Sequence, residues 1–262
     1  IAGGATDGAG NPEQGYVVRG GRMHEMHYEC YWELLSHIPS LEDPNISVRD
    51  ESYEFNQRFV SNAQARLLKD GKKLDVSSYG LSFSQQMDFI KLTYVSEESL
   101  ENKAIEDWFD KDFFETKFWY IWSTMFAFQK YSSLAEMRRY MKRFIHLVEG
   151  LPKLVGVMRT KYNQYDSVIR PMKKYLEEKG VKFEMGKEVV DIDFNLSSDD
   201  KTATLIHLKN KDQIVLRKND FVFITNGSIT ESSDNGSWAR AAVLKSVEDS
   251  GSWMLWKKLA KK

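Results

Sequence analysis

The sequence predicts a mixed α/β fold, α+β overall, in which a mainly helical lobe interrupts an α/β domain. Three observations support this prediction. Glycines crowd the first 22 residues around a short apolar run. Apolar residues recur at helical spacing between residues 84 and 149. Beyond residue 160, an amphipathic segment leads into several runs of β-branched and alternating residues, which are typical of strands.

The predicted elements of the first half are mostly helices. Residues 16–18 form a strand candidate within the glycine-rich stretch, and residues 24–38 have the apolar spacing of a helix that prolines 39 and 44 end. The remaining helix candidates are residues 84–92, 96–102, 105–109 and 133–149. The last of these is the clearest, because its apolar residues form one stripe and Gly-Leu-Pro follows it.

The second half changes to strands. A helix is predicted over residues 167–179, with Gly180 at its end. Strands are predicted at 181–185, 188–194, 202–209, 213–217 and 220–225, with hairpin turns at 195–200 and 210–212. A short helix with Trp253 and Trp256 closes the chain.

Composition bounds the function. The chain has 262 residues, of which 42% are hydrophobic and 29% are charged, as in an ordinary globular protein of one or two domains. A net charge of −1 gives no electrostatic reason to expect nucleic acid as a partner. The single cysteine, Cys30, excludes a disulfide framework and fits a reducing, cytoplasmic compartment.

Hydropathy predicts no membrane span. The most apolar stretch, residues 118–128, is shorter than the roughly 20 residues that a membrane helix needs. The first residues, Ile-Ala-Gly-Gly, lack the basic start and apolar run of a signal peptide. Since the sequence opens inside a glycine-rich loop without Met, we expect it to be an internal piece of a longer protein.

Three segments indicate a nucleotide cofactor. The first is the helix–Gly–strand unit of residues 170–194, which resembles a unit of two-dinucleotide-binding flavoproteins, and the resemblance implies that the backbone near Val189 and Val190 meets the adenine. The second is the apolar run 221–225, which enters the polar turn Asn226, Gly227 and Ser228 at the carboxyl end of a strand. The third is a set of glycines and arginines near the start of the chain. The glycines allow the backbone to approach a cofactor closely, and the arginines offer hydrogen-bond donors to phosphate. The set comprises Gly3, Gly4, Arg19, Gly20, Gly21 and Arg22, together with the adjoining Met23.

Each segment also has a plain structural interpretation as a turn or an αβ unit. The G-x-G-x-x-G fingerprint is absent from the sequence, so we expect that a dinucleotide fingerprint, if there is one, lies before Ile1. Aromatic residues, 13% of the chain, predict either a bulky core or a wide apolar cavity for a long hydrophobic ligand.

Longer motifs identify a family. The segments GYVVRGGR, HYECYWELLSHIPSL, FWYIWSTMFAFQKY, EMRRYMKRFIH, TKYNQYDSVIRPMKKYLEEKGV, FVFITNGSITESS and GSWMLWK resemble the oleate hydratase (myosin-cross-reactive antigen) family over essentially the whole chain. The resemblance implies hydration of the cis double bond of an unsaturated fatty acid, with FAD required but not consumed. It also implies a two-dinucleotide-binding flavoprotein domain from residues 1–35 and 151–235, a substrate lobe at 36–150, and a return toward the substrate side at 236–262.

The resemblance further implies an acid and a base. The Tyr of the Arg-Arg-Tyr motif matches Tyr140, the expected proton donor. Many family members read Arg-Gly-Gly-Arg-Glu, but this sequence has Met23 in place of that Glu. A thioether cannot take a proton from water, so we predict Glu25 as the base, while His24, His27 or the flavin stay open as means of orienting the water.

Other functions stay open. A flavin-dependent double-bond isomerase would share Tyr140 and need no water base, and a non-catalytic lipid-binding piece would need neither. The five histidines form no metal signature in the sequence, so we predict no metal. A homodimer and peripheral membrane contact are both possible, although no basic amphipathic helix demands the membrane.

Overall fold

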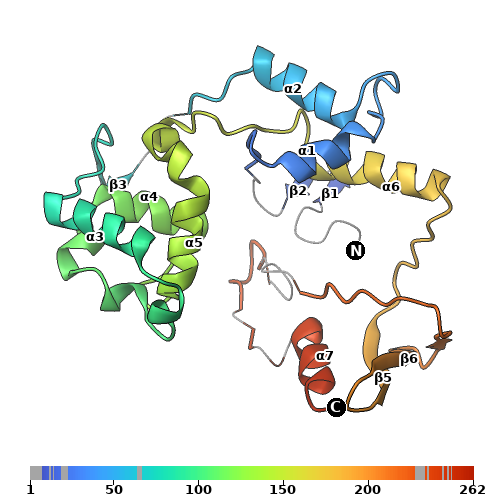
Figure 1. Ribbon diagram of the computed structural model, residues 1–262. Helices are drawn as coiled ribbons and strands as arrows, with labels where there is room; N and C mark the ends of the chain where they lie inside the picture. The colour runs from blue at the N-terminus through green and yellow to red at the C-terminus, as the bar shows by residue number, and fades with distance from the viewer. Residues whose placement is uncertain are drawn as a thin grey trace. The chain divides into compact units, whose positions relative to one another are not determined.

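The computed structural model describes residues 8–11, 13, 15–18, 23–63, 67–227, 234, 236–243, 245–246, 248 and 250–262. Within these ranges, the chain forms helices and three small antiparallel sheets, which confirms a mixed α/β composition of the α+β kind (Figure 1). No helix of the described part is long and apolar enough to cross a membrane.

The chain divides into two compact units. The helical unit comprises residues 23–30 and 53–159, and the sheet-bearing unit comprises residues 1–22, 31–52 and 160–262. The assignment of cofactor or substrate binding to particular residue ranges stays a prediction.

The helical unit is built on three helices: α3 (Phe83–Tyr94), α4 (Lys117–Phe126) and α5 (Leu134–Phe144). Polar side chains fix where they begin, since Ser82, Thr116 and Ser133 each accept a hydrogen bond from a backbone N–H of the first turn. Short 3₁₀ segments join the helices: η2 (Glu98–Leu100), η3 (Ile105–Asp107), η4 (Lys111–Glu115) and η5 (Ile145–Lys153). A small hairpin, β3 (Leu68–Lys69) and β4 (Lys72–Lys73), completes the unit.

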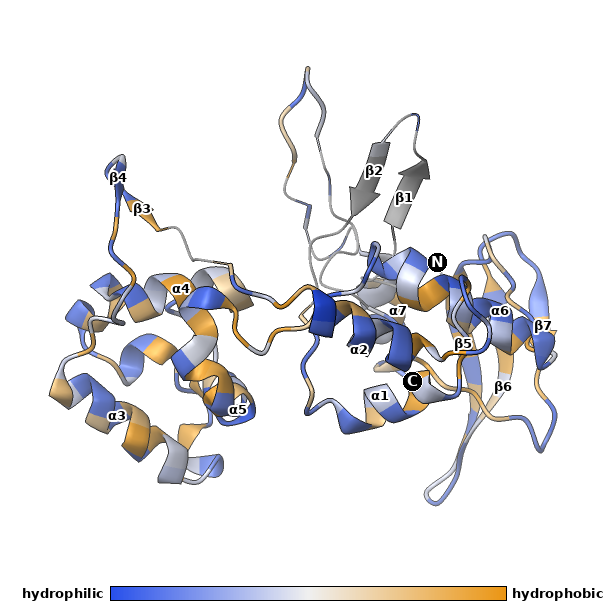
Figure 2. Cartoon of the chain, turned by 90° about the horizontal axis from the view of Figure 1, so that it is seen from above, coloured by the Kyte–Doolittle hydropathy of each residue, from blue (hydrophilic) through white to orange (hydrophobic). Residues whose placement is uncertain are grey.

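Aromatic side chains dominate the core of this unit. Phe113 is fully buried, and its ring stacks on Phe109 with the centroids 4.0 Å apart. Trp122 stacks on Phe118 at 5.5 Å. Figure 2 shows the corresponding apolar stripes on α3, α4 and α5, with hydrophilic residues between them. The bulky core predicted for the aromatic-rich segment is therefore present.

The sheet-bearing unit holds a three-stranded antiparallel sheet with the order β5 (Val189–Leu196), β6 (Lys201–Leu208) and β7 (Gln213–Val215). The hairpin β1 (Gly8–Asn11) and β2 (Gly15–Val18) contains the predicted strand at 16–18. Its helices include α6 (Arg170–Glu178), which follows the π-turn η6 (Tyr165–Ile169), and α7 (Gly251–Leu259). Two further helices, α1 (Glu29–Ser36) and α2 (Val48–Arg58), cross the boundaries of the two units in sequence.

Two predicted strands are wrong. Residues 181–185 extend from the end of α6, where Val181 N–H bonds to the carbonyl of Leu176 and no neighbouring strand is described. Residues 220–225 are also outside any sheet, with Phe221 and Phe223 85% and 87% exposed. A β-alternating pattern makes a strand only where a second backbone offers hydrogen bonds, and neither segment has such a partner among the described residues.

Several helix boundaries also differ. The helix predicted from residue 24 starts only at Glu29, because Tyr28 N–H closes a turn on the Glu25 carbonyl. The one predicted over 133–149 ends as an α-helix at Phe144 and continues as η5, and those over 96–102 and 105–109 are short 3₁₀ segments.

Candidate acid–base site

Glu25 lies at the centre of a polar cluster in the helical unit. The segment before it is fixed by a backbone bridge, in which His24 N–H donates to Met158 O at 3.2 Å and Met158 N–H donates to His24 O at 2.7 Å. The Glu25 side chain is only 2% exposed. A carboxylate so far from water needs hydrogen-bond or charge partners to offset its desolvation.

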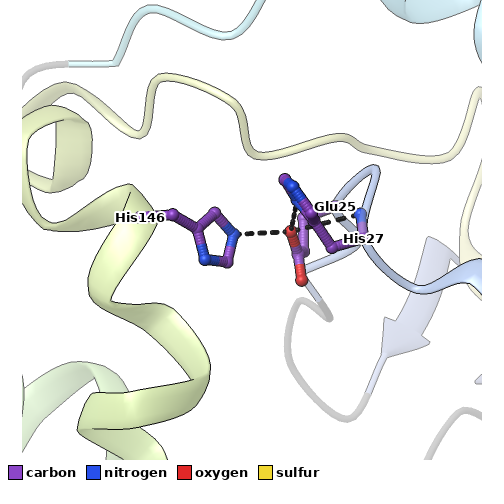
Figure 3. Close-up of side chains that lie close together, drawn as sticks. All are labelled: Glu25, His27 and His146. Atoms are coloured by element: carbon purple, nitrogen blue, oxygen red, sulfur yellow. Dashed lines mark hydrogen bonds and ion pairs between the residues drawn. The ribbon is translucent and has the colours of Figure 1, made fainter.

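Three side chains supply those partners. Nε2 of His146 and Nδ1 of His27 lie 2.9 Å and 3.0 Å from Oε2 of Glu25 (Figure 3). The guanidinium of Arg143 lies 2.6 Å from Oε1. Arg143 is on the last turn of α5 and His146 is one residue into η5, so the end of one helix provides both groups.

The cluster keeps Glu25 ionised. Burial alone would raise the pKa of this carboxyl, but hydrogen bonds from His146 and His27 and the charge of Arg143 outweigh it, so the pKa lies below its ordinary value. His24, next to it, behaves in the opposite sense: burial lowers the pKa of its imidazole and favours the neutral ring.

Tyr140 lies one turn before Arg143 on α5 and is half-buried. Its ring makes edge contacts with Phe126 and Phe128, at centroid distances of 5.3 Å and 5.2 Å. The ring of the predicted donor therefore packs in an aromatic surrounding.

Tyr28 connects the predicted acid and base. Its ring lies 4.7 Å from the guanidinium carbon of Arg143. Burial raises the pKa of Tyr28, Arg143 lowers it, and the charges of Glu25 and Tyr140 raise it further. The charges of Glu25 and Tyr140 thus both act on the same phenol, and both predicted residues belong to the helical unit.

The donor atoms of Glu25, His27 and His146 lie within 4.8 Å of one another, close enough for a metal ion. The Arg143 guanidinium already occupies the carboxylate, and its positive charge opposes a second cation at this position. We therefore assign no metal to the cluster, and the absence of a metal stays a prediction.

Sequence reasoning missed His146 and Arg143. They lie 121 and 118 residues from Glu25 along the chain, so no local spacing could pair them with it. One signal was present: Arg143 follows Tyr140 by three residues, which places both on one face of a helix.

The predicted cofactor residues are only partly described. Gly3, Gly4, Arg19, Gly20, Gly21, Arg22 and Ser228 lie outside the described residues. Of the others, Met23 is half-buried, and the carbonyls of Val190 and Asn226 accept hydrogen bonds from side chains of α7, Lys258 at 2.9 Å and Trp256 at 3.4 Å.

Gly227 fits a close approach to a ligand. Its φ of +104° is a conformation that favours glycine, and no described atom lies within 4 Å of where a Cβ would stand. The lysine beside Val190 adds a cation suited to a phosphate. The described cofactor residues are thus compatible with a nucleotide.

A separate hollow of about 270 Å³ lies in the sheet-bearing unit, lined by residues that include Glu42, Asp166 and Arg170. Of its three acidic groups, Asp166 pairs with Arg170, Glu42 pairs with Lys161, and Glu51 accepts a hydrogen bond from Ser40. It contains none of the predicted site residues.

Fold and site together define a mixed α/β protein. Its helical unit holds an ionised, buried carboxylate and a tyrosine packed among aromatic rings, and these two groups are suited to acid–base chemistry. Comparison with known proteins identifies the family. The chain belongs to the MCRA family, whose model matches residues 1–262.

Two curated relatives are similar to it. It is 42% identical to a protein named oleate hydratase from Streptococcus pyogenes serotype M49 (strain NZ131), over 99% of this chain and 45% of the relative. It is 35% identical to a protein named linoleate hydratase from Lactiplantibacillus plantarum, over 93% of this chain and 45% of the relative. The chain thus spans a little under half the length of the relatives it matches.

Proposed function

We propose that the protein is a fatty-acid hydratase that requires FAD and adds water across the cis double bond of an unsaturated acid such as oleate. The observation that carries the proposal is the juxtaposition, within the helical unit, of Tyr140 and the ionised Glu25 cluster around Tyr28 and Arg143. The names of both relatives, an oleate hydratase and a linoleate hydratase, support the substrate class.

Hydration of an alkene requires a proton for one carbon and an oriented, partly deprotonated water for the other. Tyr140 provides the proton, and its ring is held by edge contacts with Phe126 and Phe128. The Glu25 cluster provides the base that takes a proton from water, because the thioether of Met23 cannot do so. FAD, when bound, would supply the flavin ring system without net redox change, with Val190, Asn226 and Gly227 among the residues holding it.

The test is product analysis in heavy-oxygen water. The full-length protein, supplied with FAD, is incubated with oleic acid, and products are separated by mass spectrometry. A hydroxy acid carrying the label is expected from the unaltered protein, with a loss of roughly 10²- to 10⁴-fold in Tyr140→Phe. Tyr131→Phe, at a 75% exposed position outside the cluster, is the control. Absence of labelled product from any cis acid would refute hydration.

One observation favours a second candidate, a double-bond isomerase. Met23 offers no proton acceptor, and both oxygens of Glu25 are already engaged by side chains. An isomerase needs no water base, and it would give an unlabelled product with a shifted double bond. Bound fatty acid that is recovered unchanged would instead indicate a lipid-binding protein.

A further inference from the structure

Glu25 and His27 form an unequal pair. The carboxylate is 2% exposed, whereas the imidazole that donates to it has a side chain that is 62% exposed. Glu25 therefore cannot bind a water molecule without losing a partner, while the exposed ring of His27 can. Resting on the proposed hydration, we infer that His27 accepts the proton from water through Nε2, and that Glu25 is a positioning residue that fixes the tautomer and orientation of this ring.

The tautomer follows from the contacts. An ionised carboxylate only accepts hydrogen bonds, so each ring nitrogen that faces Glu25 must carry a hydrogen. For His27 that nitrogen is Nδ1, at 3.0 Å, which leaves the lone pair of the neutral ring on Nε2. For His146 it is Nε2, at 2.9 Å, which leaves the lone pair on Nδ1. A buried carboxylate that orients an imidazole in this way is the arrangement that makes a histidine an effective general base.

Exposure selects between the two rings. The His146 side chain is 31% exposed, half the value of His27, and its ring lies on η5. The His27 ring lies on the turn before α1, with its centroid 4.3 Å from that of His146. His24 is not chosen, since its ring is buried at 7% exposure.

The proton balance closes. Nε2 of His27 removes a proton from water as the oxygen bonds to one alkene carbon, and Tyr140 gives its hydroxyl proton to the other carbon. The products are the hydroxy acid, a His27 imidazolium and a Tyr140 phenolate. Transfer of one proton from the imidazolium to the phenolate, directly or through solvent, restores both groups, so one water is consumed and no redox agent is needed.

Isosteric substitutions test the assignment in the full-length protein with FAD and oleic acid. The amide of His27→Asn stands where Nδ1–H stood, so it keeps the hydrogen bond to Glu25 but removes the base at Nε2. Labelled hydroxy acid is expected to fall by roughly 10²- to 10⁴-fold. His146→Gln likewise keeps the Nε2–H donor, and a loss under about tenfold is expected there, well short of a removed general base.

A matched control exists elsewhere in the chain. His37 is also 62% exposed and also pairs with a glutamate, Glu33, at 2.7 Å, but that carboxylate is 71% exposed. His37→Gln is expected to leave the rate unchanged. Glu25→Gln is expected to lower the rate, because its amide favours the wrong tautomer of His27. Added imidazole should restore part of the activity of His27→Ala and none of the activity of Glu25→Gln, in which the His27 ring still fills the site.

The outcomes separate this inference from the proposed function. If the unaltered protein forms no labelled product, hydration itself is refuted. If it does, and His27→Asn keeps its rate or His146→Gln loses as much as His27→Asn, then His27 is not the base and hydration stands. Failure of imidazole to restore any activity in His27→Ala would also overturn the assignment.

Discussion

Removal of Arg143 offers the sharpest probe of the Glu25 cluster. Of the three side chains described above around this carboxylate, only Arg143 carries a charge at every accessible pH. Its guanidinium lies 2.6 Å from Oε1 of Glu25, and the carboxylate is 2% exposed while the arginine is 39% exposed. Arg143→Gln would therefore leave a buried charge with hydrogen bonds only.

The expected loss lies between two limits. Breaking a fully buried ion pair from one side costs about 3–5 kcal/mol, and exposed pairs are worth about 0–1 kcal/mol. Since Arg143 is more than a third exposed, solvent screens part of its charge, and we expect the free energy of unfolding to fall by about 2 kcal/mol. That corresponds to roughly a thirtyfold change in the unfolding equilibrium constant.

Urea unfolding followed by tryptophan fluorescence measures this loss, because Trp119 and Trp122 are buried in the core of the same unit. The matched control is Arg139→Gln, one turn earlier on α5. Arg139 pairs with Glu97 at the surface and is 67% exposed, so no measurable change is expected. In the double variant with Glu25→Gln, the effect of Arg143→Gln should shrink by about 1 kcal/mol or more. Equal losses in the Arg143 and Arg139 variants would refute the reasoning.

Two further predictions concern stability. Phe113→Ala should lower the free energy of unfolding by about 4 kcal/mol, since the ring is fully buried and stacked. Phe83→Ala, at a 78% exposed position, should change it by less than about 0.5 kcal/mol. A thermal melt in which both variants behave alike would contradict this. Acid should destabilise the helical unit in two stages. The folded pKa of His24 lies below its ordinary 6.5, so the unfolded chain binds that proton first and stability falls as the pH drops through about 6.5. The folded pKa of Glu25 lies below its ordinary 4.5, so a second loss follows below about 4.5; stability that rises between pH 7 and pH 5 would exclude the first stage.

The spacing of apolar residues predicted those helices and strands whose apolar side packs against a neighbouring element. The stripe of α5 appears because Leu134, Met137 and Met141 all point into the aromatic core. The β5–β6 hairpin appears because both strands have a partner directly across a short turn. The run at 221–225 has the same kind of alternation but no partner among the described residues, and a single sequence does not say where a partner backbone will be.

The residues of the candidate site likewise fall into those that the sequence predicted and those that only the structure reveals. Tyr140 was reached through family resemblance, which matches motifs position by position, whereas Glu25 was chosen because Met23 stands where the family has its Glu. The partners that decide what Glu25 can do, Arg143 and His146, become visible only when the end of α5 meets the segment that carries Glu25. That meeting depends on the backbone bridge between His24 and Met158, more than a hundred residues apart.

In the proposed mechanism, one helix links the acid to the base. Tyr140 and Arg143 share a face of α5, and Arg143 sets the charge around Glu25 while packing on the ring of Tyr28. In the proposed mechanism, loss of a proton from Tyr140 adds a negative charge that acts on Tyr28 together with that of Glu25. An imidazolium at His27, 3.0 Å from the carboxylate, would offset part of that negative charge. Under this proposal, proton donation by the tyrosine and proton acceptance by the histidine favour each other.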